Sequence, residues 1–166
     1  MGWSEDLERI DVQESELVLP RFDTETAWEL GVHLRSMAEA RKLAVVIDVR
    51  RFGQPLFYTA LEGTTPGNVE WVRRKINVVQ RYHTSSYAVG LREKIENETI
   101  YDTEGLSMAD YATHGGAFPL NVVHAGVVGC ATVSGLPQRS DHELVVEALC
   151  ELLGKDYPSL QLADEE

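Results

Sequence analysis

Two segments of the chain each join a run of β-branched and apolar residues to a second such run through a short turn. This repeated pattern constrains the fold more than any other feature. Leu43–Val49 is nearly all apolar, and a turn containing Gly53 leads to Pro55–Leu61. Phe118–Val123 is joined in the same way to Gly126–Gly135 through the turn HAG. Such pairs of runs are typical of β-hairpins, so the sequence predicts a sheet with antiparallel strands.

Helical periodicity surrounds both predicted hairpins. Apolar residues recur at intervals of three and four residues within 24–42, 68–94 and 136–154, which places an apolar stripe on each predicted helix. A shorter helix is predicted over Ser107–Thr113, where two glycines end it. This order of elements predicts an α+β domain in which helices pack against an antiparallel sheet.

Length and composition indicate how the chain is organised. The 166 residues, of which 43% are hydrophobic, fit a single domain with a buried core. Acidic residues gather at both ends, so we expect flexible tails over about residues 1–15 and 160–166. The net charge of −12 disfavours binding to nucleic acid or to an anionic membrane surface. The sequence shows neither a membrane-spanning stretch nor a secretory signal, which predicts a cytoplasmic protein.

The sequence contains few of the motifs that mark catalytic or metal sites. Cys130 and Cys150 each lie in an apolar run and are predicted to be buried free thiols. Their spacing does not fit a zinc site, so no metal site is predicted. A nucleophile elbow, a phosphate-binding loop and a dinucleotide fingerprint are all missing from the sequence. A non-enzymatic role is therefore favoured over an enzyme.

His83 falls on the apolar side of the predicted helix 68–94. One interpretation is a core histidine that is hydrogen-bonded to a backbone carbonyl. The other is a ligand to haem iron, or an acid or base in a pocket.

His114 directly precedes Gly115 and Gly116 at the end of the predicted short helix. Its imidazole either caps the C-terminus of that helix or stands at the rim of a pocket. Glycine suits both roles, because it adopts positive φ at the end of a helix and also lets the backbone approach a ligand closely.

The segment Ser134–His142 ends a strand and begins the last helix. Its exposed backbone amides would form an anion site, to which Arg139 would add a charge-assisted hydrogen bond. The alternative is that the segment only caps the helix. The predicted ligand-binding residues are His83, His114, Gly115, Gly116, Ser134, Gly135 and Arg139.

Three arginines form a basic face on the predicted helix 68–94 of this acidic protein. Arg73, Arg74 and Arg81 are either solvated or pair with acidic residues of a second subunit. Trp28 and Trp71 would be suitable anchors for such an interface. Together these residues predict a homo-oligomer.

The segments HGGAFPLNV and GVVGCATVSGLPQRSDHELVVEAL resemble the haem-degrading, glycolate-utilisation-G-like superfamily. The matching positions are Gly115, Gly116, Pro119, Gly126, Gly129, Val133, Ser134, Gly135 and Asp141. One extra residue separates the glycine pair from the proline. The segments LPRFD, VVIDVRRFGQPLF and RYHTSSYAVG are similar to an uncharacterised bacterial and fungal branch of that superfamily. The resemblance covers most of the chain, from about Leu19 to Leu153.

The resemblance implies a profilin-like fold, in which helices flank an antiparallel sheet, and assembly into rings or cages. Some members of the superfamily bind haem. We therefore hypothesise a small-ligand-binding module that acts as a homo-oligomer and takes haem or another flat anionic molecule. Two alternatives stay open. One is a protein-interaction or assembly module without a small ligand, and the other is a haem-degrading or related enzyme.

Overall fold

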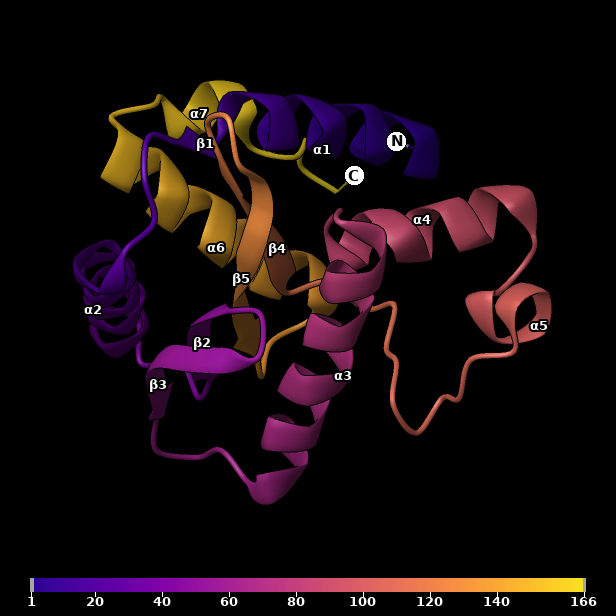
Figure 1. Ribbon diagram of the computed structural model, residues 1–166, viewed down its shortest axis with the longest axis horizontal. Coiled ribbons are helices and arrows are strands. Elements are labelled where there is room, and N and C mark those ends of the chain that lie inside the picture. The colour runs from indigo at the N-terminus through magenta and orange to yellow at the C-terminus, as the bar shows by residue number, and fades with distance from the viewer. Residues whose placement is uncertain (1, 166) are drawn as a thin grey trace.

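The computed structural model describes residues 2–165, and a five-stranded sheet lies at its centre (Figure 1). In chain order the strands are β1 (Val18–Leu19), β2 (Val46–Arg51), β3 (Gln54–Ala60), β4 (Ala117–Val122) and β5 (Gly126–Ser134). The sheet order is β1-β4-β5-β2-β3. The pairs β2–β3 and β4–β5 confirm both predicted hairpins, and antiparallel pairing of β2 with β5 joins them. The short strand β1 runs parallel to β4, so the sheet is mixed.

Helices cover both faces of this sheet, which confirms the predicted α+β fold. The helices are α1 (Trp3–Glu16), α2 (Thr24–Ala40), α3 (Pro66–Tyr82), α4 (Ser86–Glu96), α5 (Ile100–Glu104), α6 (Gln138–Leu153) and α7 (Tyr157–Leu160). Helices α2 and α6 enclose the larger apolar core on one face. Helix α3 packs on the opposite face over a smaller core.

Strand β2 contributes side chains to both cores, which explains why three of its first four residues are apolar. Ile47 and Val49 belong to the core under α2 and α6, whereas Val46 belongs to the core under α3. This alternation follows from the two-residue period of a strand. Asp48 is also buried, and the Arg50 guanidinium lies 2.7 Å from its carboxylate.

The predicted N-terminal tail is wrong, because residues 3–16 form helix α1. Ile10 and Gln13 on this helix are fully buried. The Gln13 side-chain amide donates to the Leu160 carbonyl (2.9 Å) and accepts from His142 Nε2 (2.8 Å). Leu160 and Leu162 of the predicted C-terminal tail are buried as well, whereas the described residues after Leu162 are exposed. Residues 1 and 166, the ends of the two predicted tails, lie outside the described residues.

The predicted helix 68–94 is two helices, α3 and α4, which are separated at His83. His83 adopts a left-handed conformation (φ 56°) and ends α3. Ser85 then begins α4, because its hydroxyl accepts the N–H of Ala88 (3.1 Å). One helix ends and the next begins within a few residues, so the apolar periodicity of the sequence does not reveal the break. His83 is consequently exposed, and its predicted place in the core is wrong.

The predicted helix at Ser107–Thr113 is also wrong, because this segment is a loop with a single turn. Contacts with α3 hold it in place. Arg74 Nε donates to the Met108 carbonyl (2.9 Å), and Asn77 Nδ2 donates to the Asp110 carbonyl (2.8 Å). The backbone of this loop therefore bonds to side chains of α3 in place of a helix of its own.

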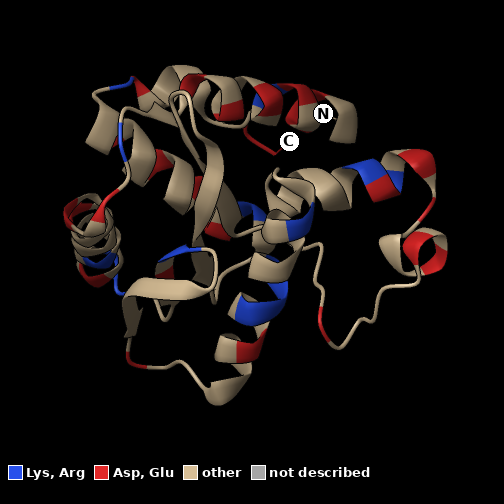
Figure 2. Ribbon diagram, in the orientation of Figure 1, with Lys and Arg blue, Asp and Glu red and all other residues tan. Residues whose placement is uncertain are grey.

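The basic face of α3, visible as blue bands in Figure 2, is paired within the chain. Arg73 forms ion pairs with Glu70 and Asp110, and Arg81 pairs with Glu104. These side chains are partly exposed, so each pair stabilises the fold only weakly. Arg73 and Arg81 nevertheless have acidic partners without a second subunit, whereas Arg74 donates to the Met108 carbonyl.

Further predictions concern the cysteines, metal ligands and membrane spans. Cys130 and Cys150 are buried free thiols, as predicted. Within residues 2–165, no three His, Cys, Asp or Glu residues are grouped as a metal site would require. In the same part of the chain, every helix is too short or too polar to cross a bilayer. The cytoplasmic location stays a prediction.

Candidate functional site

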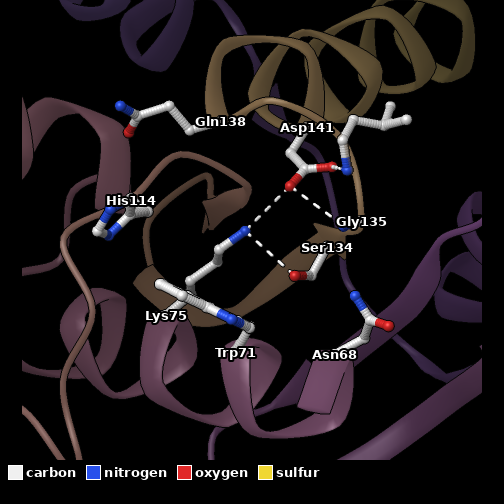
Figure 3. Close-up of a pocket in the computed structure, with 9 residues that line it drawn as sticks. Asn68, Trp71, Lys75, His114, Ser134, Gly135, Gln138 and Asp141 are labelled. Atoms are coloured by element: carbon white, nitrogen blue, oxygen red, sulfur yellow. Dashed lines mark hydrogen bonds and ion pairs between the residues drawn. The ribbon is translucent and has the colours of Figure 1, made fainter. Parts of the chain in front are cut away.

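A cavity of about 260 Å³ lies between α3, the end of β5 and the start of α6 (Figure 3). The lining residues are Asn68, Trp71 and Lys75 from α3, His114 from the loop before β4, and Ser134, Gly135, Leu136, Gln138 and Asp141 from the β5–α6 region. Segments far apart in the sequence thus meet at this cavity. It combines a buried cation, a buried carboxylate and an aromatic wall.

Lys75 is the most unusual residue of the cavity, because its charged end is buried. Its side chain is 3% exposed, and Nζ lies 3.1 Å from Oδ2 of Asp141, whose side chain is 2% exposed. Nζ also donates to the Ser134 hydroxyl and to the Val133 carbonyl, both at 3.4 Å. A buried ammonium group needs such partners, since removing it from water is otherwise very unfavourable.

Asp141 organises the connection between β5 and α6. Its Oδ1 accepts the N–H of Leu136 (2.9 Å), and its Oδ2 accepts the N–H of Gly135 (3.3 Å) as well as Lys75 Nζ. The N-cap position of α6 belongs to Pro137, which has no capping side chain. The first N–H groups of this helix therefore lack intrahelical partners, and Gln138 brings that positively polarised end to the cavity.

Two glycines let the chain pass beside the lysine. Gly116 has φ +138°, and a Cβ there would lie 2.2 Å from the Val133 carbonyl and 2.8 Å from Lys75 Nζ. A Cβ on Gly115 would lie 2.3 Å from the Gln138 carbonyl, and the Gly115 N–H donates to Gln138 Oε1 (3.1 Å). The missing side chains thus allow close packing between the start of β4, α6 and the lysine head group.

Burial shifts the pKa values of the two charged groups toward each other. Burial lowers the pKa of Lys75 from its usual 10.5, although Asp141 opposes that shift. Burial likewise raises the pKa of Asp141 above its usual 3.8, and Lys75 opposes that shift. Both shifts reduce the free energy needed to move a proton from the lysine to the carboxylate. The pair is therefore suited to acid–base chemistry.

His114 and Trp71 form one side of the cavity. Their rings meet edge to face, with centroids 4.9 Å apart, and the Arg74 guanidinium lies 4.6 Å from the Trp71 ring centre. Burial lowers the pKa of His114 below 6.5, and the nearby charges of Lys75 and Arg74 lower it further. The imidazole is therefore neutral at pH 7 and can form hydrogen bonds without adding charge.

The structure brings together only part of the predicted ligand-binding set. His114, Ser134 and Gly135 line the cavity, and the glycine pair lies directly behind it. Arg139 points elsewhere, because its guanidinium binds the Asp6 carboxylate of α1 (3.0 and 3.2 Å). His83 is also remote from the cavity and stacks on Phe52, with ring centroids 6.0 Å apart. Arg139 and His83 therefore do not line this cavity, and their ligand-binding roles stay predictions.

Lys75 is the functional candidate that the sequence analysis missed. It lies on the same helical stripe as the buried residues Val72 and Val79. A lysine three or four residues from apolar neighbours on both sides is a detectable signal of a buried charge. Trp71, Asn68 and Gln138 carry no comparable signal, because exposed helices commonly contain such residues.

The fold and the cavity define an α+β class of protein with a polar pocket at one end of its sheet. Residues 22–150 match the family described as haem degrading protein HbpS-like, and the chain belongs to that family. The UPF0303 protein of Paraburkholderia phymatum is 58% identical over 163 residues, which cover 98% of this chain and 99% of that protein. A UPF0303 protein of Burkholderia thailandensis is 61% identical over 158 residues, covering 95% and 96% of the two chains.

Solved structures share this fold. The crystal structure of Ybr137w has a TM-score of 0.83 and 26% identity, and the match covers 92% of this chain and 93% of that one. HbpS has a TM-score of 0.63 and 20% identity, covering 81% and 91%. The PduOC:haem complex has a TM-score of 0.66 and 15% identity, covering 78% and 93%. At these low identities, the last two show the fold alone.

Proposed function

We propose that this protein binds a small organic anion in the cavity between α3 and α6. The observation that carries the proposal is the Lys75 ammonium, a buried cation that lines the cavity beside the Ser134 hydroxyl. A carboxylate could accept hydrogen bonds from both groups and from the free N–H groups at the start of α6. Trp71 would pack against the apolar part of the molecule.

The contacts of Lys75 leave room for such an exchange. Its bonds to Ser134 and Val133 are long, at 3.4 Å, whereas its contact with Asp141 is 3.1 Å. A bound carboxylate could replace the two long bonds while the ion pair persists. Because Asp141 already balances the lysine charge, the remaining attraction comes mainly from the α6 dipole, about half an elementary charge. The site therefore favours a monoanion over a polyanion.

The cavity also limits the size of the ligand. Its volume of about 260 Å³ is below the roughly 300–1,000 Å³ of pockets for drug-sized molecules. At about 30 Å³ per water molecule, it has room for a ligand of roughly nine non-hydrogen atoms. Haem is far larger and does not fit this cavity. Nor does a second histidine of the described chain accompany His114 in the cavity lining.

A titration followed by ¹H–¹⁵N NMR tests the proposal. The probes are acetate, lactate, pyruvate and inorganic phosphate, with glycerol as the neutral control. We expect a carboxylate monoanion to shift the amides of Gly135, Leu136 and Gln138 and the Trp71 indole. Ser134→Ala should weaken binding about tenfold or more, since one hydrogen bond to a charged group is worth about 1.5–3 kcal/mol. If none of the anions shifts these signals, the proposal is wrong.

Haem is a second candidate ligand, which the family description and the fold shared with the PduOC:haem complex favour. Since haem does not fit the cavity, it would bind on the outer surface or between copies of the chain. His83 is exposed and lies against the flat ring of Phe52, so it is the histidine available there. A haem titration would show a Soret shift in the native chain and in His114→Ala, but not in His83→Ala. No shift in the native chain would exclude haem.

We also propose that the protein is a homo-oligomer. Trp28 is 62% exposed on α2, and Val32 is exposed one turn further along the same helix. The Trp28 ring contacts Phe57 of β3, which is the last strand of the sheet. A large exposed aromatic residue beside a sheet edge is typical of a surface that a second subunit covers.

A further inference from the structure

We propose that Lys75 is a nucleophile that forms an imine with a small 2-oxo acid in the cavity. This inference rests on the proposed function and adds a reaction to it. An imine needs a primary amine next to a bound carbonyl carbon and a nearby group that takes and returns protons. Lys75 provides the amine, and Asp141 provides the group that takes and returns protons. Lys75 Nζ and Asp141 Oδ2 lie 3.1 Å apart at the cavity.

The surroundings of Lys75 match this role on every side (Figure 3). Asp141 reaches Nζ from α6, the Ser134 hydroxyl reaches it from the end of β5, and neutral His114 stands on the loop before β4. Gly116 contributes no side chain, and a Cβ there would lie 2.8 Å from Nζ. The glycine thus lets the backbone at the start of β4 pass close to the lysine head group.

A purely structural ion pair explains these features less well. A buried pair that only joins helices can usually be replaced by apolar side chains without loss of stability. Such a pair also has no need to line a cavity. Burial lowers the pKa of Lys75 and raises the pKa of Asp141, which favours the neutral amine that can attack a carbonyl.

The reaction balances without a further reactant. Lys75 gives a proton to Asp141, and the lone pair of Nζ then forms a bond with the carbonyl carbon. The carbonyl oxygen takes the proton back from Asp141 and becomes a hydroxyl, toward which Ser134 can donate a hydrogen bond. Asp141 then takes a second proton from the nitrogen and gives it to this hydroxyl, so that the C–O bond breaks and water leaves, and the nitrogen keeps one proton and a double bond to carbon. One carbonyl and one amine become one imine and one water, with no change in oxidation state.

The carboxylate of the 2-oxo acid would place its carbonyl carbon next to the lysine. The N–H of Gln138, the first residue of α6 and part of the cavity lining, would hold the carboxylate. A molecule of pyruvate size is well within the roughly nine non-hydrogen atoms that the cavity holds. The geometry therefore selects a short 2-oxo acid over an uncharged aldehyde.

Reductive trapping tests this inference on the intact protein. Pyruvate and sodium cyanoborohydride are added together, and peptide mass spectrometry locates the adduct. The chain contains three other lysines, Lys42, Lys94 and Lys155, and all three are exposed. We expect Lys75 to be labelled at least about tenfold faster than these, because the cavity would hold pyruvate beside its amine. Equal labelling of all four lysines would overturn the inference.

Lactate separates this inference from the proposed function. Lactate has the carboxylate but no carbonyl, so it should shift the NMR signals of the cavity, form no adduct and slow the labelling of Lys75 by pyruvate. The variant Lys75→Arg keeps the charge and should still bind lactate without forming an adduct. If pyruvate shifts the cavity signals but labels no lysine, the imine is excluded and anion binding stands. If neither acid shifts the signals, both proposals are wrong.

Discussion

The Lys75 ammonium and the Asp141 carboxylate, 3.1 Å apart, connect α3 to the start of α6 within the protein interior. Each group compensates for the burial of the other, so a change to only one of them should be costly. We predict that Lys75→Met lowers the free energy of unfolding by about 3–5 kcal/mol, because Asp141 is left as an unpaired buried charge. Urea denaturation measures this loss.

The matched control is Lys75→Met/Asp141→Asn. Asparagine has no charge, and its side-chain oxygen can still accept the N–H of Leu136. The double variant should therefore recover a large part of the stability that the single variant loses. Equal stability of the wild type and Lys75→Met would show that the two groups are not coupled in solution.

Gly116 gives a second prediction, which concerns the backbone beside the lysine. Gly116→Ala should destabilise the protein by several kcal/mol, because its Cβ would lie 2.2 Å from the Val133 carbonyl at φ +138°. Gly53→Ala is the control, since Gly53 also has positive φ but has open space around it. It should lose only about 1 kcal/mol, the usual penalty for the left-handed conformation. Thermal unfolding of the two variants compares these effects, and similar losses would contradict the predicted clash.

His142 gives a third prediction, about pH. Burial lowers the pKa of His142 to about 3, and the ring is fully buried beside Gln13. Between pH 6.5 and about 3 the unfolded chain binds a proton that the folded chain does not. This histidine therefore reduces the free energy of unfolding by about 1.4 kcal/mol for each pH unit below 6.5.

The variant His142→Gln isolates that contribution. Carboxyls with raised pKa values, such as Glu14 and Glu143, change the stability in the opposite direction, but they are present in both proteins. The stability difference between wild type and variant should shrink by about 2–3 kcal/mol from pH 6.5 to 4.5. Urea denaturation at several pH values measures it. A difference that stays constant would mean that His142 titrates normally in the folded state.

The sequence predicts the sheet and several helices because their signals are local. The alternation in β2 and the glycine turn after it are readable within a few residues. Helix α1 was missed because its packing depends on the polar contact between Gln13 and His142, which lie far apart in the chain. The end of α3 at His83 was missed because a cap between two amphipathic stretches leaves the periodicity nearly intact.

From the sequence, only those residues of the site that lie next to glycines could be predicted. His114, Ser134 and Gly135 stand beside glycine-rich backbone and do line the cavity. Lys75 and Asp141 meet only because α3 and α6 both pack near the end of β5, and pair distances of this kind are set by topology. The sequence marks Lys75 by its place on an apolar stripe and Asp141 as a motif position of the superfamily, but nothing in it pairs the two residues.

The loop 105–113 gives a fourth prediction, because side chains of α3 hold it. Asn77 Nδ2 donates to the Asp110 carbonyl (2.8 Å), so Asn77→Ala should raise amide hydrogen exchange in this loop. Global stability should fall by only about 0.5–1.5 kcal/mol, the usual net worth of one hydrogen bond. Arg81→Ala is the control, since Arg81 binds Glu104 of α5 and should leave the loop unchanged. Equal hydrogen exchange in the wild type and Asn77→Ala would show that other contacts are enough to hold the loop in place.

Trp28 gives the fifth prediction, which concerns assembly. The arginines of α3 are paired within the chain, and Trp71 forms a wall of the cavity, so neither supports the predicted interface as Trp28 does. Its ring is 62% exposed and contacts Phe57 at the edge of the sheet.

If a second copy covers this surface, Trp28→Ser should lower the oligomer mass in multi-angle light scattering. The variant Trp3→Ser changes an exposed tryptophan on α1 instead and should not alter the mass. A wild-type chain that is monomeric at working concentration would exclude the interface. An aromatic side chain of this size stabilises association by several kcal/mol only when a second copy buries it.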